Sequence, residues 1–303
     1  MSLPVVAIIG INGALGTHAV NAFSSPLFKG KVATPIRIIS ADPAKAKSNI
    51  PKLNSSEYEF VTANAATGEG LDKAFEGVDV VINIAGITFS HNKIIDAVAA
   101  SKAKVYVPSE FGVPTNGPIG GYSPVLQFKS DAAKYAKSFK NFKTVSIYNS
   151  GFTEWILSTY DPIKKDPEGT IVTYEPDSRW PTTSLLNIGQ VIATIASKAN
   201  TPEVIPEYLY IKGGDIARSE IATLREKYLG SKLQVVTKPA EEITVPAKKI
   251  VENGVTGFAD FYIVLLAILT QGFGEYEANS QELVGDLFKF ETPDEVAKRI
   301  FSK

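Results

Sequence analysis

The feature that most constrains this chain is an apolar run, residues 5–9, that leads directly into Gly10, Gly13 and Gly16 and then into a helical apolar pattern. In such a turn Gly10 allows the sharp change of direction, Gly13 allows a ligand to approach the backbone, and Gly16 allows close helix–sheet packing. Unpaired N–H groups and the positive dipole end of the helix favour an anion here. The turn predicts a dinucleotide site; a tight connection without a ligand is the alternative. The predicted cofactor contacts are Gly10, Asn12, Gly13, Ala14, Leu15 and Gly16.

The first half of the chain alternates between strand and helix patterns. After the glycine turn we expect strands at residues 35–40, 61–64, 78–86 and 104–108 and helices at 17–23, 71–75 and 93–100. Strands that alternate with helices at this spacing are typical of βαβ units, which build a parallel sheet. The sequence therefore predicts an α/β fold, a Rossmann-type doubly wound parallel sheet.

Beyond residue 150 this alternation becomes irregular. The connecting segments contain several prolines, and we expect an isolated strand at 208–211 and a helix at 218–228. We expect an NAD(P)-binding domain over residues 1–155 and a smaller α+β substrate lobe over 156–303, with some strands and helices of the second segment returning to the main sheet. Substrate would then bind between the two parts, near the carboxyl ends of the strands.

Charge and composition exclude several classes of protein. Lys and Arg number 31 against 32 Asp and Glu, so the net charge of -1 gives no global attraction to nucleic acid or to an anionic membrane. Without cysteine the chain has no disulfide and no thiolate metal site, which fits a reducing compartment. The longest apolar run, residues 261–269, is too short to span a bilayer, and the N-terminus lacks the pattern of a signal peptide. We expect a cytoplasmic monomer or homodimer.

Residues 107–112 read Val-Pro-Ser-Glu-Phe-Gly. This stretch resembles the Pro-Ser-Glu-Phe-Gly motif of the isoflavone reductase-like enzymes, within the NmrA-like group of atypical short-chain dehydrogenases. The resemblance extends over the chain through residues 74–81, 91–97, 150–152, 187–189 and 292–296. It implies an NAD(P)H-dependent oxidoreductase that transfers hydride to a small aromatic or unsaturated carbonyl-type substrate. A dinucleotide-sensing regulator without turnover is the alternative, and a sugar-nucleotide epimerase-like protein a weaker one.

The resemblance also implies a catalytic residue. In that family a lysine downstream of the motif serves as acid/base or orients the substrate, and Lys129 holds the matching position. A lysine that faces a dry cleft would have a lowered pKa, which suits proton transfer at neutral pH. The residues alone equally allow a solvated surface lysine, since other lysines follow on the same segment. Tyr122, in the loop with Gly120 and Gly121, is an alternative proton donor or a surface or lid residue.

Two Tyr-x-x-x-Lys strings, the pair used by ordinary short-chain dehydrogenases, occur at residues 160–164 and 228–232. The first contains a proline that breaks the helix needed to bring Tyr and Lys to one face, and the second contains a glycine. We interpret both strings as coincidental.

Cofactor preference depends on the end of the second predicted strand. Family members that prefer NADPH tend to have an arginine where this chain has Ala41. Ser40 and Lys45 can still contact a 2′-phosphate, whereas Asp42 can accept from a free ribose hydroxyl or cap a helix that begins at Pro43. We expect NADP, with NAD as the alternative. The resemblance adds further cofactor contacts: Ala85, Gly86, Ser109, Phe111, Lys129 and Phe152.

Three further features each have two interpretations. His91 stands where many relatives have glutamine, and we expect His91 to be a loop or helix-start residue near the cofactor rather than a catalyst. Glu110 is expected to cap or pair at a strand end rather than act as a base. The aromatic and apolar segment 258–269 has helical spacing. It predicts a core helix of the lobe or, where it faces the cleft, the wall that binds a planar apolar or aromatic substrate.

Overall fold

The computed structural model describes residues 2–50, 56–158, 169–230 and 232–302. Its central element is a six-stranded sheet with the order β3-β2-β1-β4-β5-β6, in which neighbouring strands run parallel. The strand order reverses beside β1, which makes the sheet doubly wound and confirms the predicted Rossmann-type α/β fold. The strands are β1 (Val6–Ile9), β2 (Ile36–Ser40), β3 (Tyr58–Thr62), β4 (Val80–Asn83), β5 (Val105–Val107) and β6 (Lys143–Thr144).

Helices cover both faces of this sheet, which explains why its strands are continuously apolar. Val6 and Ile8 of β1 belong to the core on one face, and Ala7 and Ile9 belong to the core on the other. Helices α1 (Ala14–Ser24) and α7 (Leu185–Ser197) pack into the first core. The second core contains residues of α3 (Leu71–Ala74), α4 (Asn92–Ala100) and α5 (Pro124–Ser138).

Two segments of the second half of the chain pack into the core beside the main sheet. Strand β11 (Tyr208–Tyr210) pairs in parallel with β7 (Ser146–Tyr148), which follows β6 directly. Helix α7 lies against α1 so closely that a Cβ on Gly189 would come within 2.5 Å of the His18 carbonyl oxygen. The residues after 156 therefore include segments that pack beside the main sheet as well as those described next.

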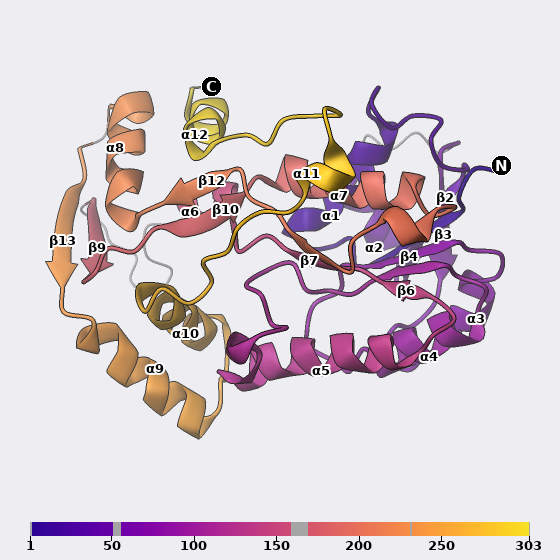
Figure 1. Cartoon of the computed structure of the whole chain (residues 1–303), viewed down its shortest axis with the longest axis horizontal. Coiled ribbons are helices and arrows are strands. Elements are labelled where there is room, and N and C mark those ends of the chain that lie inside the picture. The colour runs from indigo at the N-terminus through magenta and orange to yellow at the C-terminus, as the bar shows by residue number, and fades with distance from the viewer. Residues whose placement is uncertain (1, 51–55, 159–168, 231, 303) are drawn as a thin grey trace.

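The lobe lies at the end of the molecule away from β2 and β3 (Figure 1). It contains a three-stranded sheet, in the order β12 (Gly214–Ile216), β10 (Trp180–Thr183) and β8 (Gly151–Phe152), and a pair formed by β9 (Thr170–Tyr174) and β13 (Gln234–Lys238). Its helices are α6 (Thr153–Ser158), α8 (Arg218–Leu229), α9 (Glu241–Asn253), α10 (Phe258–Thr270) and α12 (Pro293–Phe301); the short α2 (Pro43–Ser48) and α11 (Gln281–Val284) lie elsewhere in the chain.

Element boundaries differ from the expected ones by a few residues. Helix α1 begins at Ala14 rather than at residue 17, because Gly13 is already its N-cap. Strand β3 begins at Tyr58 rather than at residue 61. Of the two Tyr-x-x-x-Lys strings, the one at 160–164 lies outside the described residues. In the other, at 228–232, the Tyr228 hydroxyl donates a hydrogen bond to the Asp294 side chain over 2.9 Å. In the described part of the chain, no helix combines the length and apolar character needed to cross a membrane.

Candidate functional site

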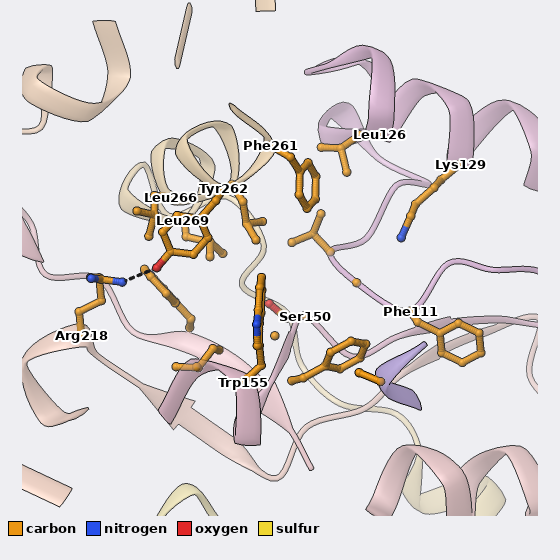
Figure 2. Close-up of a pocket in the computed structure, with 18 residues that line it drawn as sticks. Phe111, Leu126, Lys129, Ser150, Trp155, Arg218, Phe261, Tyr262, Leu266 and Leu269 are labelled. Atoms are coloured by element: carbon orange, nitrogen blue, oxygen red, sulfur yellow. Dashed lines mark hydrogen bonds between the residues drawn. The ribbon is translucent and has the colours of Figure 1, made fainter. Parts of the chain in front are cut away.

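A cavity of about 340 Å³ lies where the main sheet, α5 and the lobe meet (Figure 2). Its volume is in the range of pockets that hold small organic ligands. Most of its wall is aliphatic or aromatic. The lining residues are Ala14, Phe111, Gly112, Val113, Leu126, Lys129, Ser150, Gly151, Phe152, Trp155, Ile156, Trp180, Arg218, Phe261, Tyr262, Leu265, Leu266 and Leu269.

Helix α5 presents Lys129 to this cavity. The helix starts at Pro124, after Ser123, whose side chain caps it by accepting from the Leu126 N–H. The Lys129 side chain extends from α5 toward the cavity (Figure 2). Its Nζ donates to the Glu110 carbonyl oxygen. Burial lowers the pKa of Lys129 because the ammonium loses solvation, and the negative charge of Glu110 opposes this change. Lys129 is half-buried, on the wall of the cavity.

Glu110 is 1% exposed and provides the carboxylate next to Lys129. Its Oε1 accepts a hydrogen bond of 2.7 Å from the Thr115 hydroxyl, and its Oε2 has no hydrogen-bond partner among the described residues. Burial raises the pKa of Glu110, while the positive charge of Lys129 lowers it. The two groups therefore stabilise each other's charged forms inside a region that disfavours both.

Two lining residues adopt left-handed backbone conformations, which residues other than glycine rarely adopt. They are Phe111, with φ of 28°, and Ser150, with φ of 49°. The Gly112 carbonyl oxygen ties the two loops together, since it accepts from the Asn149 N–H (3.1 Å) and the Ser150 N–H (3.0 Å). Strained backbone of this kind gathers at ligand-binding sites, where the surrounding structure enforces it.

At two of the three glycines of the turn an added Cβ would collide with the backbone, and at the third it would not. A Cβ on Gly10, whose φ is 90°, would lie 2.3 Å from the Ala85 Cα, and a Cβ on Gly16 would lie 1.7 Å from the Ile11 carbonyl oxygen. A Cβ on Gly13 would meet nothing within 4 Å. Gly13 is the N-cap of α1 and has no side chain to accept from the first N–H groups of the helix, and Gly13 and Ala14 are exposed. This arrangement fits a phosphate group.

A buried network fixes the loop after β4, opposite Gly10. The Asn83 Oδ1 accepts from the Ala85 N–H (3.0 Å), so its Nδ2 donates to the Tyr106 hydroxyl (3.1 Å) and to the His91 Nδ1 (3.3 Å). The hydrogen of His91 is then on Nε2, which donates to the Gly86 carbonyl oxygen over 2.9 Å. Burial lowers the pKa of His91, which favours this neutral form. His91 thus positions the Ala85–Gly86 loop.

Ser109 also holds this loop, since its hydroxyl donates to the Ala85 carbonyl oxygen over 2.7 Å. Of the other predicted cofactor contacts, Ala14, Phe111, Lys129 and Phe152 line the cavity. The structure therefore brings together residues from α1, α5, β8 and the loop after β5.

The predicted phosphate-specificity residues lie at the carboxyl end of β2. Ser40 is engaged with the backbone of Asp42, and the Asp42 side chain caps α2 by accepting from the Lys45 N–H over 3.0 Å. Ala41 and Lys45 are exposed. Asp42 thus has the capping role that was one of its two interpretations.

Tyr122 is not among the cavity-lining residues. It follows a 3-10 turn at Pro118–Gly121, and its hydroxyl accepts from the Gln271 Nε2 over 3.1 Å. The apolar segment forms α10, whose Val264, Ala267 and Ile268 belong to the core of the lobe. Its cavity face consists of Phe261, Tyr262, Leu265, Leu266 and Leu269.

Sequence reasoning missed three important wall residues, Trp155, Trp180 and Arg218. The chain has two tryptophans and both line the cavity, so the rarity of tryptophan was a sequence signal that could have identified these two wall residues. Arg218 gave no signal, because an arginine at the start of a charged helix is usually solvated. Here it is buried, and its Nε donates to the Val172 carbonyl oxygen over 2.8 Å.

Comparison with known proteins gives relatives along the whole chain. The Arabidopsis thaliana isoflavone reductase homolog P3 is 27% identical over 257 residues, covering 78% of this chain and 79% of that protein. The crystal structure of an isoflavone reductase superimposes with a TM-score of 0.75 at 20% identity, covering 98% and 99% of the two chains. A structure of AtPrR2 with NADP+ and (+)pinoresinol superimposes with a TM-score of 0.74 at 16% identity, covering 99% of each chain.

The family itself follows from a match to its sequence model. The model of the NmrA-like family matches residues 4–279, which include the glycine turn, the residue 107–112 motif and Lys129. The predicted NmrA-like resemblance is therefore confirmed. The chain belongs to the NmrA-like family.

Proposed function

We propose that the protein is an NADPH-dependent reductase that transfers hydride to a small aromatic or unsaturated carbonyl-type substrate, with Lys129 as the proton donor. The observation that carries this proposal is a desolvated ammonium on the wall of a largely apolar cavity that also includes Ala14, the first residue of α1. The relatives support it, since one similar fold was solved with NADP+ and an aromatic ligand. Lys129 would act between that cofactor and the substrate.

The residues of the turn fit a dinucleotide. Gly13 leaves room for a pyrophosphate at the uncapped N-terminus of α1, and the braced loop of Ala85 and Gly86 borders the same end of the sheet. Exposed Lys45 and Lys47 on α2 supply positive charge for a 2′-phosphate. When bound, NADPH supplies the hydride.

The chain's own residues handle the proton. The Glu110 carbonyl oxygen orients the Lys129 ammonium by accepting one of its three hydrogens. A second hydrogen can then point at a substrate oxygen or carbon in the cavity. The lowered pKa of Lys129 makes the ammonium a better acid than a solvated lysine, and the apolar wall excludes water that would compete for the proton. The substrate gains one hydride and one proton, and Lys129 is reprotonated from solvent.

The experiment compares the wild type with Lys129→Met and with Lys134→Met, a control on the exposed face of the same helix. Each protein is titrated with NADPH and then assayed for NADPH oxidation with a panel of quinones, enones and aromatic ethers. We expect Lys129→Met to retain NADPH binding through the glycine turn, with at most the loss of one contact, and to lose about 10²- to 10⁴-fold in turnover, the usual contribution of a general acid. Lys134→Met should behave as wild type.

Two results would contradict the proposal. Turnover that survives in Lys129→Met would remove the lysine from the mechanism. NADPH binding without turnover on any member of the panel would instead favour the dinucleotide-sensing regulator, and cofactor-dependent binding of a protein partner would then be the positive sign of that role.

A further inference from the structure

Ser150 is a cavity-lining residue whose hydroxyl group receives no hydrogen-bond partner from the described residues. It lies in the loop between β7 and β8 and is 7% exposed. Its Oγ is buried, and no donor or acceptor among the described residues pairs with it. An unpaired buried hydroxyl lowers the stability of a fold, so a position that keeps one calls for a functional explanation.

The backbone of Ser150 adds a second cost at the same residue. Its φ of 49° lies in the left-handed region, which glycine adopts without strain and serine does not. Glycine at this position would remove both the strain and the unpaired hydroxyl. Two local costs that coincide on the wall of a cavity are typical of a functional position, where local stability is given up for ligand binding.

Gly112 connects Ser150 to the end of the cavity that contains Lys129. The Gly112 carbonyl oxygen accepts from the Ser150 N–H over 3.0 Å, and a Cβ built on Gly112 would lie 3.6 Å from the Lys129 Nζ. Figure 2 shows Lys129 and Ser150 as residues of the same cavity wall, the first on α5 and the second in the loop before β8. Both side chains are therefore near Gly112.

A serine hydroxyl can serve a ligand in this setting. It donates one hydrogen bond and accepts others, and rotation about the single χ1 bond turns it from one direction to another. Most of the surrounding wall is aliphatic or aromatic and offers the hydroxyl no partner. A ligand oxygen that accepts from Ser150 would remove the cost of the unpaired group, whereas a hydrocarbon of the same shape would leave that cost in place.

We propose that Ser150 is a substrate-binding residue that donates a hydrogen bond to an oxygen atom, a carbonyl or hydroxyl group, near the reacting end of the substrate. This proposal rests on the proposed function, because it places that end of the substrate between Lys129 and Ser150. The hydroxyl selects aromatic molecules that have an oxygen at this end over hydrocarbons of equal size. The bound substrate then completes the hydrogen bonding that the free protein leaves open.

The experiment uses two probes of nearly equal shape, 4-acetylbiphenyl and 4-isopropenylbiphenyl, in which a carbonyl oxygen is exchanged for a CH₂ group. Equilibrium dialysis measures the affinity of each probe for the NADP+-saturated protein. Ser150→Ala removes only the hydroxyl, and Ser150→Gly removes the hydroxyl and the backbone strain. The matched control is Thr153→Val, because the Thr153 hydroxyl is also buried and unpaired among the described residues but Thr153 is not among those that line the cavity.

We expect the wild type and Thr153→Val to bind the ketone about 2- to 10-fold more tightly than the alkene, the usual effect of one hydrogen bond. Both Ser150 variants should lose this preference and retain the affinity for the alkene. Thermal denaturation of the free proteins gives a second readout. The melting temperature of Ser150→Ala should equal or exceed that of the wild type, because the variant loses a hydroxyl that has no partner.

Four results would overturn the assignment of Ser150. They are a wild type without preference, a preference that persists in both Ser150 variants, no binding of either probe, and an equal loss of affinity for both probes together with a lowered melting temperature, which would make the hydroxyl structural. Ser150→Gly decides the matter if Ser150→Ala does not fold. Neither readout needs turnover, so a Ser150-dependent preference in a protein that never oxidises NADPH would overturn the proposed reductase and leave the binding role of Ser150 standing.

Discussion

Replacing Gly13 with alanine should weaken NADPH binding and leave the stability of the fold nearly unchanged. Gly13 has φ of -85° and ψ of 176°, which alanine adopts without strain, and a Cβ there meets nothing within 4 Å. The remaining cost is the weaker N-cap preference of alanine, about 1 kcal/mol or less. We therefore expect Gly13→Ala to fold and to unfold at nearly the wild-type temperature.

The same methyl group would stand where the proposed pyrophosphate approaches α1. Forcing an extra methyl into a filled site costs about 1–3 kcal/mol. This corresponds to a Kd for NADPH that is raised about 5- to 150-fold. The assay is a titration followed by the fluorescence of bound NADPH, together with a thermal denaturation of the same samples.

Two glycines serve as controls for this prediction. Gly117 is also an N-cap with extended backbone and open space around its Cβ, so Gly117→Ala should leave both stability and Kd unchanged. Gly16→Ala should instead destabilise the fold, because its Cβ would lie 1.7 Å from the Ile11 carbonyl oxygen. A wild-type Kd for NADPH in Gly13→Ala would refute the phosphate assignment of the turn.

Three more predictions concern charge and packing. In the wild type the folded state lowers the pKa of Lys129, so the free energy of unfolding should rise with pH between that pKa and 10.5, and urea denaturation across pH should show this rise in the wild type and not in Lys129→Met. Glu110→Gln should move the alkaline loss of kcat to lower pH, because the Glu110 carboxylate raises the pKa of Lys129. Gly189→Ala should lower the free energy of unfolding by about 1–3 kcal/mol, since its Cβ would lie 2.5 Å from the His18 carbonyl oxygen, and thermal denaturation should detect the loss.

The first half of the fold was predictable because its signals are local. Buried parallel strands are continuously apolar, and each is followed by a turn and a helix, as β4 and α4 illustrate. The lobe was less predictable because its strands are short and pair with distant segments. Strand β8, for example, has two residues and pairs with β10, so no local periodicity identifies either partner.

The residues of the site likewise divide into those that the sequence indicates and those that it does not. Phe111 belongs to the residue 107–112 motif and Lys129 comes after it in the sequence, and both line the cavity. Arg218 reaches the cavity only because β9 and α10 fold against α8, an arrangement that no sequence pattern announces. Tyr122 shows the opposite case, since a residue well placed in the sequence is held outside the cavity lining by a contact with Gln271.

The most direct test of the account follows the transferred hydride itself. NADPH deuterated at the reactive face of the nicotinamide C4 is incubated with the wild type and each enone and aromatic ether of the panel, in which hydride is delivered to carbon and the label does not exchange with water, and products are analysed by mass spectrometry. We expect one deuterium in the product for each NADPH consumed, and labelled product that forms about 10²- to 10⁴-fold more slowly with Lys129→Met. Labelled product formed by Lys129→Met at the wild-type rate, or no labelled product from the wild type with any compound, would contradict it.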